Sequence, residues 1–234
     1  MRYPRIIAHR GGGALAPENT LAGLRLAARL GCRGVEFDVM LSADGVPILM
    51  HDETLERTTD GSGAVAAQRF AALRTLDAGI SHGAAFRGER IPTLEEALAL
   101  CAALGLWANV EIKPSTGRDA ETGAVVGHLL AQQWRGNGIV SSFSMTALTA
   151  ARQAAPHLAW ALLVEDIPPD WRERLAALGG AALHYRADAA AAVVADIPRA
   201  CYTVNRRDDA EKLFAAGVAA IFTDRPDLWL AAEM

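Results

Sequence analysis

Two histidines, His9 and His51, bracket a pair of carboxylates, Glu36 and Asp38, near the start of the chain. Imidazole titrates near neutral pH, so it can take up or release a proton during a reaction. The two acids stand two residues apart in the apolar run 34–39, and alternate side chains of a strand point to the same face. Such a pair repels itself unless a cation lies between the carboxylates. The pattern indicates metal-assisted acid/base chemistry on a phosphate ester.

A third acid, Glu111, lies in a second predicted strand within residues 107–114, and Lys113 follows it on the same face. Glu111 could complete a cage of three carboxylates with the two earlier acids. Oxygen ligands suit a hard divalent cation such as Mg²⁺ or Ca²⁺ rather than Zn²⁺ or copper. Lys113 and Arg10 would supply fixed positive charge for an anionic substrate.

A series of short motifs runs in order through nearly the whole chain. The motifs are His9-Arg10-Gly11, Pro17-Glu18-Asn19-Thr20, Glu36-x-Asp38, His51-Asp52, Glu111-Ile112-Lys113, Ser142-Phe143, Tyr202-Thr203-Val204-Asn205 and Phe222-Thr223-Asp224. Together they resemble the glycerophosphodiester phosphodiesterases, and most closely the short bacterial cytoplasmic members. A single motif of this set is a weak signal, whereas the ordered set is much more specific.

The resemblance implies hydrolysis of a glycerophosphodiester to sn-glycerol 3-phosphate and an alcohol, with one divalent cation, Mg²⁺ or Ca²⁺, and a cyclic phosphate intermediate. It leaves the preferred alcohol open, and also which histidine acts as acid and which as base. The residues that it implies are the metal ligands Glu36, Asp38 and Glu111, the acid/base pair His9 and His51, and the substrate contacts Arg10, Lys113, Phe143 and Tyr202. Tyr202 stands where many relatives carry tryptophan, and a phenol keeps the apolar ring while adding a hydroxyl.

The elements that must position these residues alternate between short strand-like runs and helical segments rich in alanine and leucine. The expected strands are 6–9, 35–39, 107–112, 139–143, 159–164, 181–185, 200–204 and 219–223. The expected helices are 20–30, 93–104, 120–134, 145–154, 170–178, 187–194, 208–215 and a short one from 226. This alternation predicts a (β/α)8 TIM barrel, as the resemblance also implies. Active sites of that fold lie at the carboxyl ends of the strands.

Two segments depart from the simple alternation. Residues 41–46 look like a hairpin turn before a strand at 47–50, and an antiparallel return would bring His51 back beside the carboxylates. The stretch from about 52 to 90 is longer than a usual strand-to-helix loop, which predicts a small insertion over the barrel mouth after the second strand. The segment 187–197 is short for a complete helix with two loops, so its helix is expected to be truncated or irregular.

Length and composition indicate one domain spanning residues 1–234, because no linker, repeat or low-complexity tract divides the chain. The net charge of −4 gives no broad basic surface for nucleic acid, and we see no basic amphipathic helix for stable membrane association. The chain begins directly with a strand and leaves no room for a secretory signal, so a cytoplasmic location is expected. The three cysteines are expected to be buried thiols. The oligomeric state is open.

Simpler roles exist for several of these residues. Lys113 could serve only as an ion-pair partner for Glu111, Arg10 could cap a carbonyl, and Asn19 or Thr20 could cap the first helix. The two aromatic side chains could simply pack. The other histidines are expected to be core or capping residues, namely His82, His128, His157 and His184.

Three other functions also fit parts of the pattern. A phospholipase C-like or sphingomyelinase D-like phosphodiesterase on the same barrel would need a membrane-facing surface. A barrel that only binds phosphate would be expected to have lost a histidine or an acid. A metal-dependent sugar isomerase would spread its metal ligands over more strands and have little need of Arg10-Gly11.

Overall fold

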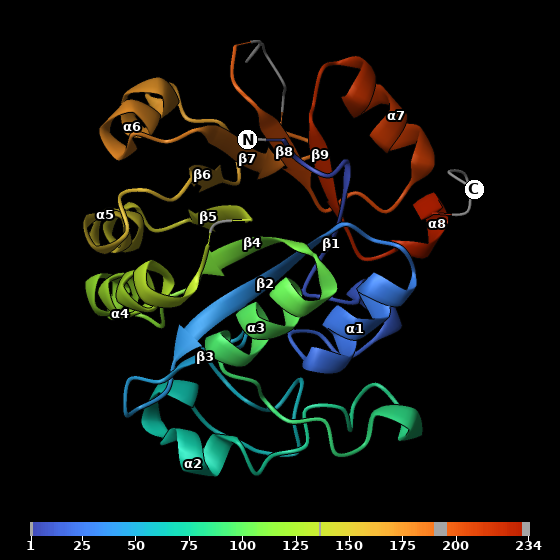
Figure 1. The fold of residues 1–234 in the computed structure, drawn as a ribbon, viewed down its shortest axis with the longest axis vertical. Coiled ribbons are helices and arrows are strands. Elements are labelled where there is room, and N and C mark those ends of the chain that lie inside the picture. The colour runs from blue at the N-terminus through green and yellow to red at the C-terminus, as the bar shows by residue number, and fades with distance from the viewer. Residues whose placement is uncertain (1, 136, 190–195, 231–234) are drawn as a thin grey trace.

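A closed ring of parallel strands forms the centre of the computed structural model (Figure 1), which describes residues 2–135, 137–189 and 196–230. The strands of the ring, in the order in which they pair, are β1 (Ile6–Ala8), β2 (Gly34–Leu41), β4 (Trp107–Ile112), β5 (Gly138–Ser142), β6 (Trp160–Val164), β7 (Ala182–Arg186), β8 (Arg199–Tyr202) and β9 (Ala220–Thr223). Parallel pairing of β1 with both β2 and β9 closes the ring. The predicted (β/α)8 TIM barrel is confirmed.

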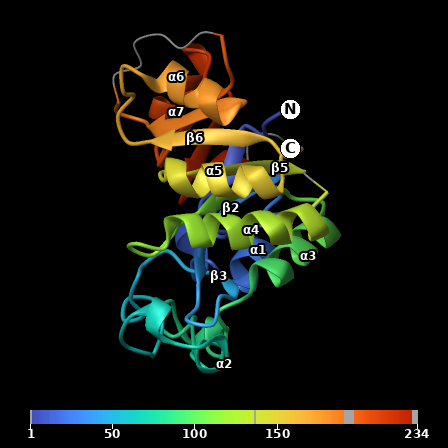
Figure 2. The same ribbon diagram turned by 90° about the vertical axis from the view of Figure 1, so that its left-hand side faces the viewer.

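Helices between the strands cover the outside of the barrel (Figures 1 and 2). They are α1 (Leu21–Arg29), α3 (Leu94–Leu104), α4 (Asp119–Gln133), α5 (Met145–Ala154), α6 (Trp171–Leu178), α7 (Arg207–Ala215) and α8 (Asp227–Leu230). Each agrees with a predicted helix to within a few residues. The predicted helix 187–194 lies mainly outside the described residues. In the described part of the chain, no helix is long and apolar enough to span a lipid bilayer.

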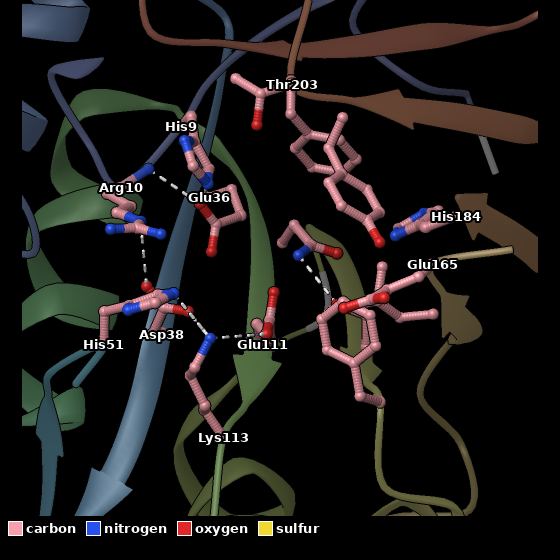
Figure 3. A pocket seen from close by; sticks show the side chains of 16 residues that line it. His9, Arg10, Glu36, Asp38, His51, Glu111, Lys113, Glu165, His184 and Thr203 are labelled. Atoms are coloured by element: carbon pink, nitrogen blue, oxygen red, sulfur yellow. Dashed lines mark hydrogen bonds and ion pairs between the residues drawn. The ribbon is translucent and has the colours of Figure 1, made fainter. Parts of the chain in front are cut away.

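Alternation along β2 explains how one strand serves both the core and the pocket. Val35, Phe37 and Val39 are fully buried in a cluster with residues of α1 and α3, as expected for side chains that face the helix layer. The intervening Glu36 and Asp38 point into the barrel (Figure 3). The strand therefore holds its acids rigidly, because its other face is anchored in the core.

A short antiparallel strand, β3 (Pro47–Leu49), pairs with the far end of β2, where Leu49 lies opposite Val39. This is the predicted hairpin return. The residues after β3 form η2 (Val65–Ala67), α2 (Phe70–Leu73) and η3 (Ala84–Phe86). They pack on β3 around a small core of their own that includes Leu55, Val65, Leu73 and Ile91. Both ribbon views show this segment at one end of the molecule, beyond β3 (Figures 1 and 2).

The interior of the barrel is filled below the pocket by a separate cluster of buried side chains. It combines the rings of Tyr3, Trp107 and Phe222 with small alanines from several strands. Such layers of inward side chains make the barrel a packed core rather than a pore. The three cysteines are free thiols and buried, as predicted.

Candidate active site

The carboxyl ends of the barrel strands surround a pocket of about 390 Å³ (Figure 3). Every site residue expected from the sequence lines it, namely His9, Arg10, Glu36, Asp38, His51, Glu111, Lys113, Phe143 and Tyr202. They come from five barrel strands or the loops that follow them, and from the β3 return. The fold thus brings together residues that are up to 193 positions apart in sequence (202 − 9).

Three buried acids face one another at the floor of this pocket. Asp38 of β2 lies directly opposite Glu111 of β4 in the parallel register. One carboxylate oxygen from each of Glu36, Asp38 and Glu111 lies within 4.8 Å of the others. Among the described residues, Oε1 of Glu36 and Oε1 of Glu111 have no hydrogen-bond partner. Buried carboxylate oxygens without a partner are costly, so the donor set fits a hard divalent cation.

The pKa values of the three acids reflect their crowding. Burial, together with the charges of Asp38 and Glu111, raises the pKa of Glu36 well above its usual range. Burial and Asp38 likewise raise the pKa of Glu111. Burial acts in the same direction on Asp38, but nearby Lys113, His51 and Arg10 outweigh it and leave the Asp38 pKa lowered. The cage does not carry three negative charges without additional positive charge.

Two cationic side chains lie on the same side of the pocket as the acids (Figure 3). Arg10 Nε is 3.7 Å from Asp38 Oδ2, and Lys113 Nζ is 3.6 Å from Asp38 Oδ1 and 3.8 Å from Glu111 Oε1. The backbone N–H of Arg10 also donates to Glu36 Oε2 at 2.8 Å, from a residue with a φ of 50°. Lys113 is therefore more than a partner of Glu111, and Arg10 contacts the acids through both main chain and side chain.

Each of the two pocket histidines is held by its own carboxylate. His9 Nδ1 donates to Asp224 Oδ1 at 2.7 Å, and His51 Nδ1 donates to Asp52 Oδ1 at 2.6 Å. A carboxylate can only accept here, so Nδ1 carries the proton and Nε2 presents a lone pair to the pocket. Nε2 of His51 accepts from Lys113 Nζ at 2.7 Å. Both rings are thereby fixed in orientation and tautomer.

Arg57, from the segment after β3, joins the supports of two pocket residues. Its guanidinium donates to both oxygens of Asp52, at 2.5 and 2.9 Å, and to both oxygens of Glu18, at 2.6 and 2.8 Å. Asp52 holds His51, while Glu18 accepts from Arg10 Nη1 at 3.0 Å. One side chain thus fixes the acid behind a histidine and the acid behind an arginine.

The Pro17-Glu18-Asn19-Thr20 motif has a second structural role beside the pocket. Thr20 caps α1 by accepting from the Gly23 N–H at 3.2 Å, which is one of the two alternatives expected. Asn19, with a φ of 56°, donates to Asp38 Oδ2 at 2.8 Å and accepts from the Asp38 N–H at 3.0 Å. Helix capping and the alignment of Asp38 therefore depend on neighbouring residues.

Two aromatic rings form another part of the pocket wall. The Phe143 and Tyr202 rings meet edge to face, with centroids 6.0 Å apart and an interplanar angle of 89°. The Tyr202 hydroxyl donates to the Val164 carbonyl at 2.8 Å, and Phe143 stays 46% exposed. These rings leave apolar surface open to a ligand.

The sequence profile of the glycerophosphoryl diester phosphodiesterase family matches residues 9–228. The chain belongs to this family. It is 34% identical over 238 aligned residues to a glycerophosphodiester phosphodiesterase of Caldanaerobacter subterraneus subsp. tengcongensis, an alignment that covers 95% of the chain and 94% of the relative. Family membership makes the chain a hydrolase of glycerophosphodiesters.

Solved structures of this phosphodiesterase family agree with the barrel. A phosphodiesterase of Oleispira antarctica, in complex with the product sn-glycerol-3-phosphate, superposes with a TM-score of 0.90 at 40% sequence identity. That comparison covers 98% of this chain and 96% of the other. A structure from Silicibacter pomeroyi DSS-3 has a TM-score of 0.84 at 27% identity and covers 98% and 95% of the two chains.

Several residues that line or support the pocket of this family member had no role in the sequence-based prediction. Asp52 and Asp224 stand inside recognised motifs, and an acid next to a candidate histidine was the signal available for Asp52. Arg57 gave no such signal, because an isolated arginine in a long loop matches no pattern. His184 was expected to be a core or capping residue; it is fully buried but also lines the pocket, and its Nε2 is hydrogen-bonded to the Tyr3 hydroxyl at 2.7 Å. Glu165, at the end of β6, also lines the pocket.

Proposed function

We propose that this protein hydrolyses glycerophosphodiesters to sn-glycerol 3-phosphate and an alcohol, with one divalent cation, Mg²⁺ or Ca²⁺, and with His9 and His51 as the acid/base pair. The observation that carries the proposal is the pair of carboxylate-backed histidines beside three buried acids in one pocket. The product sn-glycerol-3-phosphate in the structure of the Oleispira antarctica relative supports it.

Glu36, Asp38 and Glu111 would hold the cation, and their unpaired buried oxygens support this assignment. When bound there, a divalent cation lowers the pKa of a nearby hydroxyl and neutralises charge on phosphoryl oxygens. Both ions accept oxygen ligands, and the choice between them depends on the size and flexibility of the cage.

Arg10 and Lys113 would bind the phosphoryl oxygens. Their positions next to Asp38 keep both cations at one wall of the pocket before substrate arrives. Positive groups already in place stabilise the negative charge that grows on phosphorus-bound oxygens, because they need little rearrangement in the transition state. Glu18 accepts a hydrogen bond from the Arg10 guanidinium at 3.0 Å and so helps to hold it in place.

The histidines would divide the proton transfers. In the first step, one Nε2 takes the proton of the glycerol hydroxyl that attacks phosphorus, while the other imidazolium gives its proton to the departing alkoxide. This forms the cyclic phosphate and releases the alcohol. Water then opens the ring with the two histidines in exchanged roles, which restores their starting protonation. Asp52 and Asp224 would hold the rings of His51 and His9, respectively, in the orientation that these transfers need.

The first test is release of sn-glycerol 3-phosphate from glycerophosphocholine by metal-stripped protein, with and without added Mg²⁺ or Ca²⁺. We expect release only with metal, and the more effective ion identifies the cofactor. Release of equal extent in the presence of a chelator would contradict the metal requirement. No release with either ion, from protein with a native circular dichroism spectrum, would contradict the proposed reaction.

A second test separates the metal ligands from the histidines. We expect His9→Ala and His51→Ala to lower turnover by about 10²- to 10⁴-fold while metal affinity, measured by calorimetry, stays near that of the wild type. Glu36→Ala and Asp38→Ala should lower metal affinity and activity together. His157→Ala is the matched control, because His157 is exposed and outside this pocket. Normal turnover in either histidine variant would remove that residue from the acid/base role.

A further inference from the structure

The pocket has two unlike sides. Arg10 and Lys113 lie on the same side of the pocket as the acid cage, while Glu165 lies on the opposite side (Figure 3). Tyr202 lies next to Glu165, because its hydroxyl donates to the carbonyl of the preceding Val164, and its ring contacts that of Phe143. Among the described lining residues, arginine and lysine occur only at positions 10 and 113. The proposed phosphate site therefore occupies one part of the pocket, and the part around Glu165 has negative and aromatic character.

Glu165 is an exposed acid in the wall of this pocket and has no role in the proposed binding of metal or phosphate. The backbone N–H of Arg186 donates to the Glu165 carbonyl at 3.2 Å. The Arg186 guanidinium instead pairs with Asp166 at 3.1 Å and with Asp188 at 2.6 Å. Within the described part of the chain, no cation lies within ion-pair distance of the Glu165 carboxylate. This carboxylate is available to a ligand.

The aromatic rings next to Glu165 complete a set of groups that attract positive charge. Val164, which accepts the Tyr202 hydroxyl, directly precedes Glu165, so the tyrosine ring is anchored beside the carboxylate. Burial and, next, the charge of Glu165 raise the pKa of Tyr202, so the phenol stays neutral. Aromatic faces attract ammonium groups through the ring quadrupole, and an adjacent carboxylate strengthens the attraction.

We propose that Glu165, Phe143 and Tyr202 form the subsite for the alcohol of the substrate and select alcohols that carry an ammonium group, such as choline and ethanolamine. This inference rests on the proposed function. If Arg10 and Lys113 hold the phosphate and the acid cage faces the glycerol hydroxyl, the alcohol extends toward the remaining wall. A phosphate or a sugar acid would be repelled there, and a neutral alcohol would gain little from the carboxylate.

The test compares two substrates of the same shape that differ in charge: glycerophosphocholine and the glycerophosphoryl ester of 3,3-dimethylbutanol, in which carbon replaces the choline nitrogen. For the wild type we expect kcat/KM to be about tenfold higher for the choline ester. Glu165→Gln should lower the ratio of the two kcat/KM values by about five- to tenfold. Asp166→Asn is the matched control, since Asp166 pairs with Arg186 and does not line this pocket. Its ratio should equal that of the wild type.

The outcomes separate the two proposals. A ratio that is the same in the wild type and in Glu165→Gln, or a wild type that cleaves both esters equally, would overturn the ammonium subsite and leave the hydrolysis intact. A wild type that cleaves neither ester with metal present would overturn the proposed function and this inference with it. Inhibition of the wild type by free choline but not by free 3,3-dimethylbutanol tests the same subsite without any substitution.

Discussion

At the scale of single residues, the acid cage opposes the stability of the metal-free protein. The pKa of Glu111 is raised by burial and by Asp38, so folding holds a proton on this group at pH values where the unfolded chain releases it. Because the folded state then binds more protons than the unfolded state, stability falls as pH rises from the unfolded pKa of about 4.5 toward the folded one. A cation bound in the cage would remove this penalty.

We therefore expect Glu111→Gln to stabilise the metal-free protein at about pH 8 by about 2 kcal/mol, and by much less at about pH 5. Urea unfolding in a chelator at the two pH values measures the difference. Added metal should stabilise the wild type but not Glu111→Gln. Glu173→Gln, at an exposed position on α6, is the control and should change neither quantity. A wild type that is more stable than Glu111→Gln without metal at the higher pH would contradict the prediction.

Arg57 offers a second prediction at this scale. A lysine has one ammonium and cannot bind two carboxylates at once in the manner of the guanidinium, so Arg57→Lys should release Asp52 or Glu18. We expect kcat to fall about tenfold with little change in stability, because exposed ion pairs add little to folding. Arg57→Ala should recover part of its kcat when guanidinium ion is added at low concentration.

The matched control for the Arg57 variants is Arg69→Lys. Arg69 is 79% exposed in its side chain and pairs only with Asp44, at 3.5 Å, in the same segment of the chain. Its kcat should stay unchanged. An Arg57→Lys enzyme with wild-type kcat would show that His51 and Arg10 keep their orientation without the shared guanidinium.

At the scale of elements, strand β7 holds the His184 imidazole in a fully buried position, where water cannot solvate its protonated form. Burial lowers its pKa to about 3. Above the unfolded pKa of about 6.5 both states are neutral; below it the unfolded chain takes up a proton that the folded strand excludes. The stability supplied by the neutral ring is therefore present above about pH 6.5 and is lost as pH falls toward about 3.

His184→Gln should remove this loss of stability at acid pH, since glutamine can still form a hydrogen bond with the Tyr3 hydroxyl but does not titrate. We expect the wild type to lose about 1 kcal/mol per pH unit relative to the variant between about pH 6 and about pH 4. Denaturant unfolding across that range is the measurement. His157→Gln, on the exposed loop before β6, should follow the wild type. Parallel curves for the wild type and His184→Gln would disprove the role of this histidine.

Sequence patterns located the elements well because each barrel strand is a short apolar run between turn signals. Even the β3 return was predictable, since Asp44-Gly45 marks a tight turn and Gly45 adopts the positive φ of 77° that such a turn needs. The histidines and acids were found through their ordered motifs. Their mutual placement follows from the barrel, in which strand ends converge regardless of sequence separation.

The contacts that hold the site residues in place could not be predicted from sequence patterns. The hydrogen bond from Asn19 to Asp38 depends on the positive φ of Asn19, and the sequence does not reveal this conformation at a non-glycine residue. Arg57 reaches Glu18 only because the long segment after β3 folds back on the barrel. Glu165 looks like an ordinary loop charge until the pocket shows where its strand ends. Long-range pairing between irregular segments leaves no periodic trace in the sequence.

At the scale of the whole molecule, we propose that residues 1–234 fold as a single domain. The segment after β3 has its own small core, but that core includes Met40 of β2 and Ile48 of β3, so it shares side chains with the sheet. A core that is built partly from the barrel should not persist after the barrel unfolds. Barrel and segment are therefore expected to unfold together.

A tryptophan reporter tests this expectation. All five natural tryptophans lie between positions 107 and 229, and thus outside the segment. Phe70→Trp adds a reporter to α2, within the segment. Unfolding is followed by far-ultraviolet circular dichroism, by the fluorescence of the natural tryptophans, and by the fluorescence of the variant minus that of the wild type, which reports on residue 70. We expect all three signals to give one midpoint. A separate, earlier transition at residue 70 would show that the segment is an independent unit.

The hydrogen bond between His9 and Asp224 joins the first and last strands of the barrel at the proposed active site. β1 pairs with β9, and the His9 N–H donates to the Thr223 carbonyl beside the acid that holds its ring. A chain that is shortened before β9 would keep His9 but lack both the strand that pairs with β1 and the acid that holds the imidazole. We expect such a shortened chain to have no phosphodiesterase activity, even though the other proposed site residues are present.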